Sequence, residues 1–233
     1  MGIADNLAAI HERIARAAQR AERNSGKVRL MAVTKRVSAV RIIEAHEAGQ
    51  FLFGENRVQE FAGKQAALTQ LGGAEFHLIG HLQSNKAGKA VELFHSIDSL
   101  DSVNLGERLN AAAEKLGKTL EVLIEINIGG EDAKAGVALD SPELDRIFAA
   151  ACAWPNLHIQ GFMTVPPFTE DPEGARPYFR RLRELRDRVA ARNLPSVRLD
   201  ELSMGMSHDF EVAIEEGSTC VRVGTAIFGE RGK

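Results

Sequence analysis

The stretch VRLMAVTK, residues 28–35, is the first indication of how this chain folds. Its residues are apolar or favour β-structure, so the stretch predicts a buried strand. The strand ends at Lys35, and two interpretations of this lysine are open. Its stem can cover apolar surface while its ammonium group reaches water. Alternatively, a partly desolvated amine at a strand end is a nucleophile at the mouth of a site.

Seven further runs of the same kind predict seven more strands. These are FLFGEN (51–56), EFHLIGHLQ (75–83), HSIDSL (95–100), LEVLIEINI (120–128), LHIQGFMTV (157–165), RLDELSMGM (198–206) and TCVRVGTAIFG (219–229). A helical pattern or a helix-sized gap separates consecutive runs. The clearest helix is predicted at 177–193, where Tyr178, Leu182, Leu185 and Val189 share one face. Asp171–Pro172 upstream is a candidate cap with a first-turn proline.

Eight strands that alternate with helices predict an α/β fold, a single TIM (β/α)8 barrel. An open doubly wound sheet is the structural alternative. The chain has little length after the eighth strand, so an extra N-terminal helix, with Ile3, Leu7, Ile10 and Ile14 on one face, is expected to cover that part of the barrel wall. We expect one domain over residues 1–233.

Composition narrows the classes of function. The chain has 233 residues and a formal net charge of −3, with a pI near 6.2. This charge gives no reason to expect nucleic acid or an anionic membrane as a partner. No apolar run is long enough to span a bilayer, and no signal-peptide pattern is present. Cys152 and Cys220 suggest no disulfide framework, so a cytoplasmic location is expected.

Functional residues of a TIM barrel lie at the carboxyl ends of its strands. The residues at these ends are mostly polar, with one lysine amine among hydroxyls, amides and an arginine. They include Thr34, Lys35, Glu55, Asn56, His81, Gln83, Ser84, Asn85, Asn127, Thr164, Ser203, Ser207, Arg222, Gly224 and Thr225. The last two strand ends carry glycines with hydroxyl residues, a composition that suits phosphate oxygens. Together with the lysine, this favours a phosphorylated carbonyl ligand, either pyridoxal phosphate or a sugar phosphate bound by a Schiff-base aldolase.

Arg222 lies two residues before Gly224, so both point to the same face of the last strand. A charged arginine inside a barrel needs a partner. One interpretation is a hydrogen bond to a pyridine nitrogen. That nitrogen would stay largely unprotonated, because arginine does not readily yield its proton. The other interpretation is an ion pair with Asp200, Glu201 or Asp209.

Five blocks carry a family resemblance: AVTK, FGENRVQE, HLIGHLQSNK, SMGMSHD and VRVGTAIFG. They occur in order across nearly the whole chain, which resembles the YggS/PROSC family of pyridoxal-phosphate homeostasis proteins. The resemblance implies a TIM barrel similar to the N-terminal domain of alanine racemase. It also implies a protein that binds pyridoxal 5′-phosphate and keeps it available to other enzymes, without established catalytic turnover. Candidate recipients are apo forms of pyridoxal-phosphate enzymes, and we expect a monomer or a weak homodimer.

The resemblance also implies a role for each site residue. Lys35 would hold the cofactor as a Schiff base, and Asn56 would lie near its ring. Arg222 would face the pyridine nitrogen, and the phosphate would lie against Ser203, Gly224 and Thr225. Arg57 departs from the family pattern, because related sequences often carry an aromatic residue at this position. The rim of the pocket is therefore expected to differ from that of the relatives.

The alternative function is a pyridoxal-phosphate-dependent, racemase-like enzyme. A racemase needs a second base that faces the lysine across the substrate. Tyr178 is the only tyrosine and lies on a helix face, so His81 is the nearest candidate by strand position. His77 and His81 have the spacing of a helical metal pair but lie in a predicted strand, so no metal site is expected.

Overall fold

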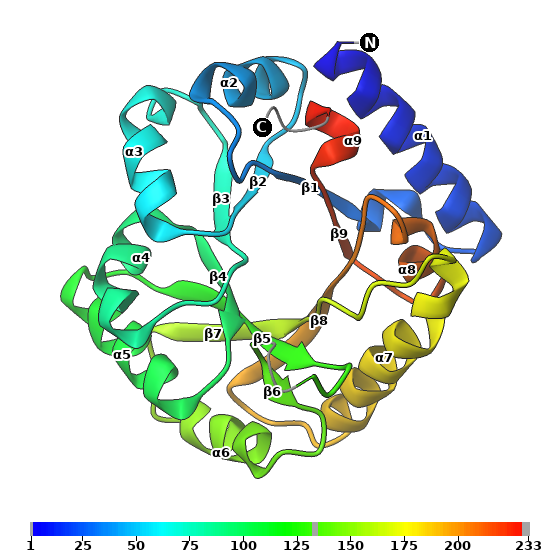
Figure 1. Ribbon diagram of the computed structural model, residues 1–233. Coiled ribbons are helices and arrows are strands. Elements are labelled where there is room, and N and C mark those ends of the chain that lie inside the picture. The colour runs from blue at the N-terminus through cyan, green and yellow to red at the C-terminus, as the bar shows by residue number, and fades with distance from the viewer. Residues whose placement is uncertain (1, 132–134, 230–233) are drawn as a thin grey trace.

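The computed structural model describes residues 2–131 and 135–229. Eight parallel strands in this part of the chain close into a barrel (Figure 1). They are β1 (Arg29–Val33), β2 (Leu52–Glu55), β3 (Glu75–Leu78), β4 (Ser96–Leu100), β5 (Leu120–Asn127), β7 (Leu157–Met163), β8 (Val197–Met206) and β9 (Cys220–Val223). β4 pairs with β5, and β9 returns to β1, so the sheet has no open edge between them. The predicted TIM barrel is confirmed, and the open-sheet alternative is wrong.

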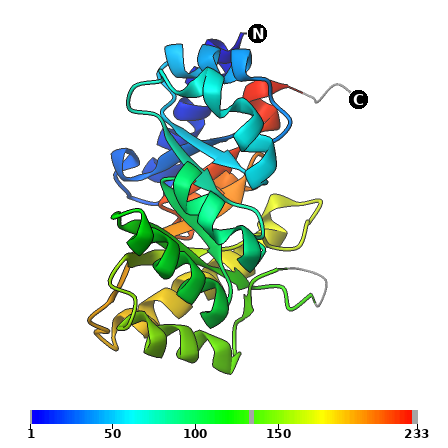
Figure 2. The same ribbon diagram turned by 90° about the vertical axis from the view of Figure 1, so that its left-hand side faces the viewer.

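A ring of helices surrounds the barrel (Figures 1 and 2). The helices are α1 (Ile3–Arg20), α2 (Ala39–Glu47), α3 (Val58–Leu68), α4 (Ala87–Leu93), α5 (Val103–Lys115), α6 (Pro142–Ala151), α7 (Arg176–Ala190), α8 (Phe210–Glu215) and α9 (Thr225–Phe228). Short 3-10 turns are η1 (Ser25–Lys27), η2 (Ser84–Lys86) and η3 (Pro172–Ala175). None of the helices in the described ranges is long and apolar enough to cross a membrane.

α1 covers the wall beside the last strand. Its apolar stripe of Ile3, Leu7, Ile10 and Ile14 is buried, and the helix packs against α8 and α9 (Figure 1). The expected role of the extra N-terminal helix is confirmed. The physical reason is that an amphipathic stripe must bury its apolar face against another element.

Several local features differ from the sequence predictions. The short strand β6 (Val137–Ala138), which pairs with β5 beside the barrel, was not predicted. On α7 the buried aromatic residue is Phe179, whereas Tyr178 is half-buried. Asp171 does accept a hydrogen bond from the backbone N–H of Glu173, but it caps the turn η3 that precedes α7.

The predicted strand at 219–229 is too long. β9 ends at Val223, and Thr225–Phe228 form α9. The backbone N–H groups of Ile227 and Phe228 both donate to the carbonyl oxygen of Gly224. Burial of Ile227 and Phe228 against the core outweighs their preference for β-structure. Gly224 therefore lies at the point where the last strand turns into a helix.

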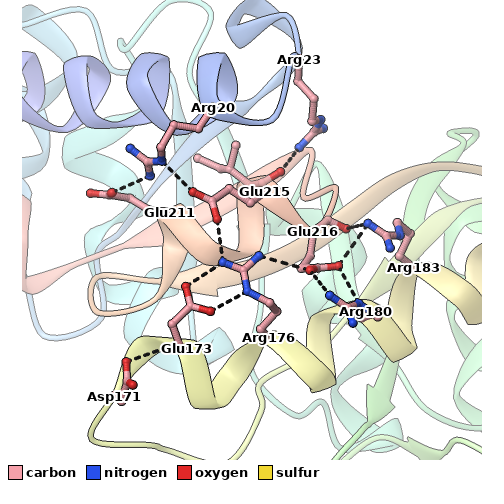
Figure 3. A network of polar contacts seen from close by, with 11 residues as sticks. Arg20, Arg23, Asp171, Glu173, Arg176, Arg180, Arg183, Glu211, Glu215 and Glu216 are labelled. Atoms are coloured by element: carbon pink, nitrogen blue, oxygen red, sulfur yellow. Dashed lines mark hydrogen bonds and ion pairs between the residues drawn. The ribbon is translucent and has the colours of Figure 1, made fainter.

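Charged residues bind α8 to its neighbours (Figure 3). Glu216, directly after α8, is nearly buried and pairs with three arginines of α7: Arg176, Arg180 and Arg183. Arg176 also pairs with Glu173 at 2.6 Å and Glu215 at 2.7 Å. Arg20 of α1 pairs with Glu215 at 2.8 Å. These contacts join α1, α7 and α8 behind the loop that follows β8.

Candidate functional site

A cavity of about 350 Å³ lies at the carboxyl ends of the strands. Five of the six predicted site residues line it: Lys35, Asn56, Arg222, Gly224 and Thr225. The remaining lining residues are Val33, Ile79, Val165, Met206, Ser207 and His208. The polar residues predicted at the strand ends therefore include most of the polar lining of one pocket, here called the Lys35 pocket.

The residue before Lys35 fixes the start of the loop that follows β1. The backbone N–H of Thr34 donates to the carbonyl oxygen of Gly54 at 2.9 Å, and its hydroxyl donates to Glu55 Oε1 at 2.8 Å. Lys64 Nζ donates to the carbonyl oxygen of Thr34 at 2.9 Å. Lys35 follows this anchored residue and is half-buried in the pocket wall. Its amine is therefore presented from a fixed backbone.

Arg222 is almost fully buried at the base of the Lys35 pocket. Its Nη1 donates to Ser203 Oγ at 2.8 Å, and its Nη2 donates to the carbonyl oxygen of Thr164 at 2.7 Å. Burial lowers the pKa of Arg222, while nearby carboxylates raise it. Among the described residues no carboxylate forms an ion pair with it, so the ion-pair interpretation is wrong. Two neutral oxygens hold this cation instead.

The three proposed ion-pair partners have other environments. Asp209 Oδ1 accepts a hydrogen bond from the backbone N–H of Met206 at 2.6 Å, which closes the loop after β8. Glu201 Oε2 lies 3.8 Å from Nη1 of Arg29. Asp200 is exposed.

Ser203 is the sixth predicted residue, and it does not line the pocket. Its side chain is fully buried, and its hydroxyl accepts the hydrogen bond from Arg222. The structure thus gives Ser203 a contact with the arginine, and its direct contact with a phosphate stays a prediction. The sequence could not separate Ser203 from Ser207, because both belong to the same strand-to-loop segment.

Ser207 is a pocket residue that the assignment of the phosphate contacts had left out. Its Oγ lies 3.4 Å from Oγ1 of Thr225, so the loops after β8 and β9 bring two hydroxyls together. Gly224, also in the lining, leads into α9. Hydroxyl and backbone N–H groups are suitable donors to anionic oxygens.

Asn56 has an unsatisfied polar atom. Its Oδ1 is buried, and no hydrogen-bond partner for it exists in the described part of the protein. The position is tight, since a Cβ added to Gly80 would lie 2.3 Å from the backbone oxygen of Asn56. A buried acceptor without a partner is uncommon in folded proteins, and a bound ligand can satisfy it.

The histidines occupy different places from those expected. His208 lines the Lys35 pocket, where Nε2 lies 3.1 Å from the carbonyl oxygen of Thr169. His81 lines a neighbouring cavity instead. His77 is buried, and its Nδ1 lies 3.2 Å from Asp98 Oδ2. The described residues contain no cluster of three or more side chains that could hold a metal ion.

Glu125, on β5, is a second buried group with an unsatisfied atom. It is 9% exposed, and its Oε2 has no hydrogen-bond partner among the described residues. Burial, with help from the charge of Asp101 and against that of Arg222, raises its pKa to about 7. This carboxyl group therefore changes protonation near neutral pH.

Comparison with known proteins identifies relatives of the whole chain. Residues 6–232 match the family model of the alanine racemase N-terminal domain. The pyridoxal phosphate homeostasis protein of Aquifex aeolicus (strain VF5) is 45% identical over 231 residues, covering 99% of both chains.

Solved structures agree with this similarity. PipY of Synechococcus elongatus PCC7942, in a structure with PLP bound, is similar with a TM-score of 0.84 and 37% identity. The match covers 97% of this chain and 100% of that one. Alanine racemase of Clostridium difficile 630 has a TM-score of 0.73 at 13% identity, covering 98% of this chain and 58% of that one. This last likeness shows the shared fold.

The family model and the identity over full length agree with the five sequence blocks. The chain belongs to the alanine racemase N-terminal domain family and, within it, to the group of pyridoxal phosphate homeostasis proteins.

Proposed function

We propose that this protein binds pyridoxal 5′-phosphate in the Lys35 pocket, as a Schiff base on Lys35, and serves the homeostasis of that cofactor without catalytic turnover. The observation that carries the proposal is the meeting of Lys35, Arg222, Ser207 and Thr225 in one pocket. The relative with PLP bound and the relative named for pyridoxal phosphate homeostasis support it.

The donor set of the Lys35 pocket fits the three polar parts of this cofactor. Pyridoxal phosphate supplies an aldehyde that condenses with primary amines and a pyridine ring that withdraws electrons. The amine of Lys35 is the group that would bind the aldehyde. Arg222, which has donors beyond the two in use, would donate to the pyridine nitrogen. Because the guanidinium keeps its proton, the ring would be a weak electron sink, which suits storage better than catalysis.

The other end of the pocket suits the phosphate. We assign the phosphate to the hydroxyls of Ser207 and Thr225 and to the backbone at Gly224, which together provide short, uncharged donors. Ser203 would act indirectly, by orienting Arg222. Asn56, with its unsatisfied Oδ1, would lie beside the ring.

The proposal extends to the cellular role. Apo forms of pyridoxal-phosphate enzymes are the proposed recipients of the cofactor, in the cytoplasm. We propose a monomer or a weak homodimer with neither nucleic acid nor membrane as a partner, in keeping with the net charge of −3.

An absorbance spectrum tests the proposal directly. Purified protein mixed with pyridoxal phosphate should develop a visible band, and borohydride reduction should remove that band and fix the cofactor on Lys35, as mass spectrometry of peptides would show. Lys35→Ala should abolish the band. Lys89→Ala, at an exposed lysine of α4, is the matched control. A normal band in Lys35→Ala, or a colourless wild type, would overturn the proposal.

His208 favours a second candidate, a racemase-like enzyme. It is the histidine found in the lining of the Lys35 pocket among the described residues, and a base in this position could exchange a proton with a bound amino acid. Deuterium incorporation at the α-carbon of alanine, measured with repeated turnover and lost in His208→Ala, would establish this function. Absence of turnover in loaded wild-type protein would support the homeostasis role.

A further inference from the structure

We propose that a second cavity, next to the Lys35 pocket, binds a small organic anion through a carboxylate or phosphate group. This cavity has a volume of about 620 Å³ and is called here the Arg57 cavity. The loop from β2 to α3, the first turn of α3 and the segment from β3 to η2 form its walls. Asn56 lines both cavities, so the two spaces adjoin at that residue.

Two basic side chains, Arg57 and Lys86, line the Arg57 cavity. Arg57 is exposed and Lys86 is half-buried. Neither side chain has a hydrogen bond or an ion pair with another described residue. A partly desolvated ammonium group gains from an opposite charge that displaces its water. An anion in this cavity would supply the partner that the fold itself does not provide.

His81 adds a third nitrogen-bearing side chain. Its Nδ1 lies 3.1 Å from Asp101 Oδ2, which fixes the orientation of the ring. In the tautomer that donates to Asp101, Nε2 is an acceptor, and in the protonated ring it becomes a donor. Gln59 and Gln83 add uncharged amide donors to the lining.

Glu60 is the carboxylate of this lining, and Lys64 offsets part of its charge. Lys64 Nζ donates to Oε1 of Glu60 at 2.7 Å, and the backbone N–H of Arg36 donates to the same oxygen. Burial would raise the pKa of Glu60, but these hydrogen bonds and the charges of Lys64 and Arg57 lower it. Lys64 Nζ also pairs with Oε1 of Glu55 at 3.0 Å, so Glu60 still attracts Arg57. With Arg57 and Lys86 against Glu60, the lining keeps a net positive charge for a ligand.

The backbone adds to the positive potential. Arg57 is the N-cap residue of α3, an eleven-residue helix, and its side chain makes no capping hydrogen bond. The first N–H groups of a helix have no partner within the helix and favour an anion nearby. With two cations, an oriented imidazole and these amides, the cavity fits an oxyanion on a metabolite-sized molecule. A ligand in this place would lie beside whatever occupies the Lys35 pocket.

The test is a titration with two probes, inorganic phosphate and succinate, followed by calorimetry and by the NMR signals of the His81 ring. The protein is first loaded with pyridoxal phosphate and reduced with borohydride, so that the Lys35 pocket is filled. At low ionic strength, wild type should bind at least one probe and shift the His81 signals. Arg57→Gln and Lys86→Gln should each weaken binding about 10-fold.

Lys89→Gln is the matched control, since it removes the same charge from an ion-paired residue outside the cavity. It should bind as wild type does. Binding of phosphate alone identifies a phosphoryl ligand, and binding of succinate alone identifies a carboxylate ligand. Binding that is equal in wild type and both cavity variants, or no binding of either probe to wild type, overturns the proposal. The visible band before reduction reports separately on whether pyridoxal phosphate is bound in the Lys35 pocket. If this band is absent, the titration with phosphate and succinate is carried out on the Lys35→Ala variant.

Discussion

Arg222 holds Ser203 in a buried hydrogen bond of 2.8 Å between Nη1 and Oγ. The arginine is on β9 and the serine on β8, and both side chains lie inside the barrel. This bond joins the base of the Lys35 pocket to the neighbouring strand. It explains how the guanidinium stays in one orientation within the barrel although no described carboxylate forms an ion pair with it.

Ser203→Ala should therefore act through Arg222. Loss of the acceptor leaves a buried charged donor unsatisfied, which should cost about 1–3 kcal/mol of unfolding free energy. The cofactor band should shift or its affinity should fall, because Arg222 is no longer fixed. Urea denaturation and a pyridoxal phosphate titration measure the two effects.

Ser218→Ala is the control for that substitution. Ser218 is equally buried, and its hydroxyl donates to backbone oxygens such as that of Met204 at 2.8 Å, away from Arg222. It should lower stability without changing the spectrum. An unchanged spectrum and affinity in Ser203→Ala would show that the bond has no influence on the pocket.

Glu125 should make stability depend on pH. Burial raises its pKa to about 7 in the folded protein, whereas an unfolded chain has an ordinary glutamate pKa of about 4.3. The folded state therefore binds more protons between these values, and the Glu125 contribution to stability falls as pH rises through this window. Glu125→Gln removes this dependence, so it should stabilise the protein at pH 8 by up to about 3 kcal/mol and have little effect near pH 4.

Denaturant unfolding over a pH series checks this expectation. Glu121→Gln, at an exposed glutamate of the same strand, is the matched control and should leave the pH profile unchanged. If Glu125→Gln and wild type differ by the same amount at every pH, the carboxyl group does not titrate in this range.

Gly80→Ala should displace Asn56. The added Cβ would lie 2.3 Å from the backbone oxygen of Asn56, a distance that forces the backbone to move. Because Asn56 lines both cavities, affinity for pyridoxal phosphate should fall at least several-fold. Gly88→Ala, in α4, has no atom within 4 Å of its added Cβ and should be neutral or slightly stabilising. Equal affinity for pyridoxal phosphate in both variants would mean that cofactor binding does not depend on the position of Asn56.

Arg176→Ala should loosen the packing of α8. Arg176 pairs with Glu173, Glu215 and Glu216, and Glu216 is only 5% exposed on its side chain. Removing the guanidinium should lower the unfolding free energy by roughly 1–3 kcal/mol. Arg186→Ala, which breaks a single pair with the exposed Asp187 on the same helix, should cost less than about 1 kcal/mol. Thermal melts at two salt concentrations measure the stability of both variants. Equal losses of stability would show that Arg176 does not hold α8 more strongly than an ordinary surface pair does.

The barrel was predictable because strands that are buried on both sides leave a continuous apolar signal. The eight runs marked the eight barrel strands, and their order along the chain fixed their order in the sheet. Errors occurred where tertiary packing overrode local preference, as at α9, where β-favouring residues form a helix. The short strand β6 has too few residues to leave a signal.

The sequence by itself determined the kind of fold, the strand ends and therefore most of the Lys35 pocket, because the carboxyl ends of parallel strands converge at one end of a barrel. Only the tertiary structure decided which of two nearby serines faces the pocket, what holds Arg222 and which histidine lines the Lys35 pocket. Those outcomes depend on side-chain direction and on contacts between residues far apart in the chain, such as Arg222 and Thr164. A sequence pattern indicates which residues are neighbours within one helix or strand. Closure of the barrel decides which residues from different strands become neighbours.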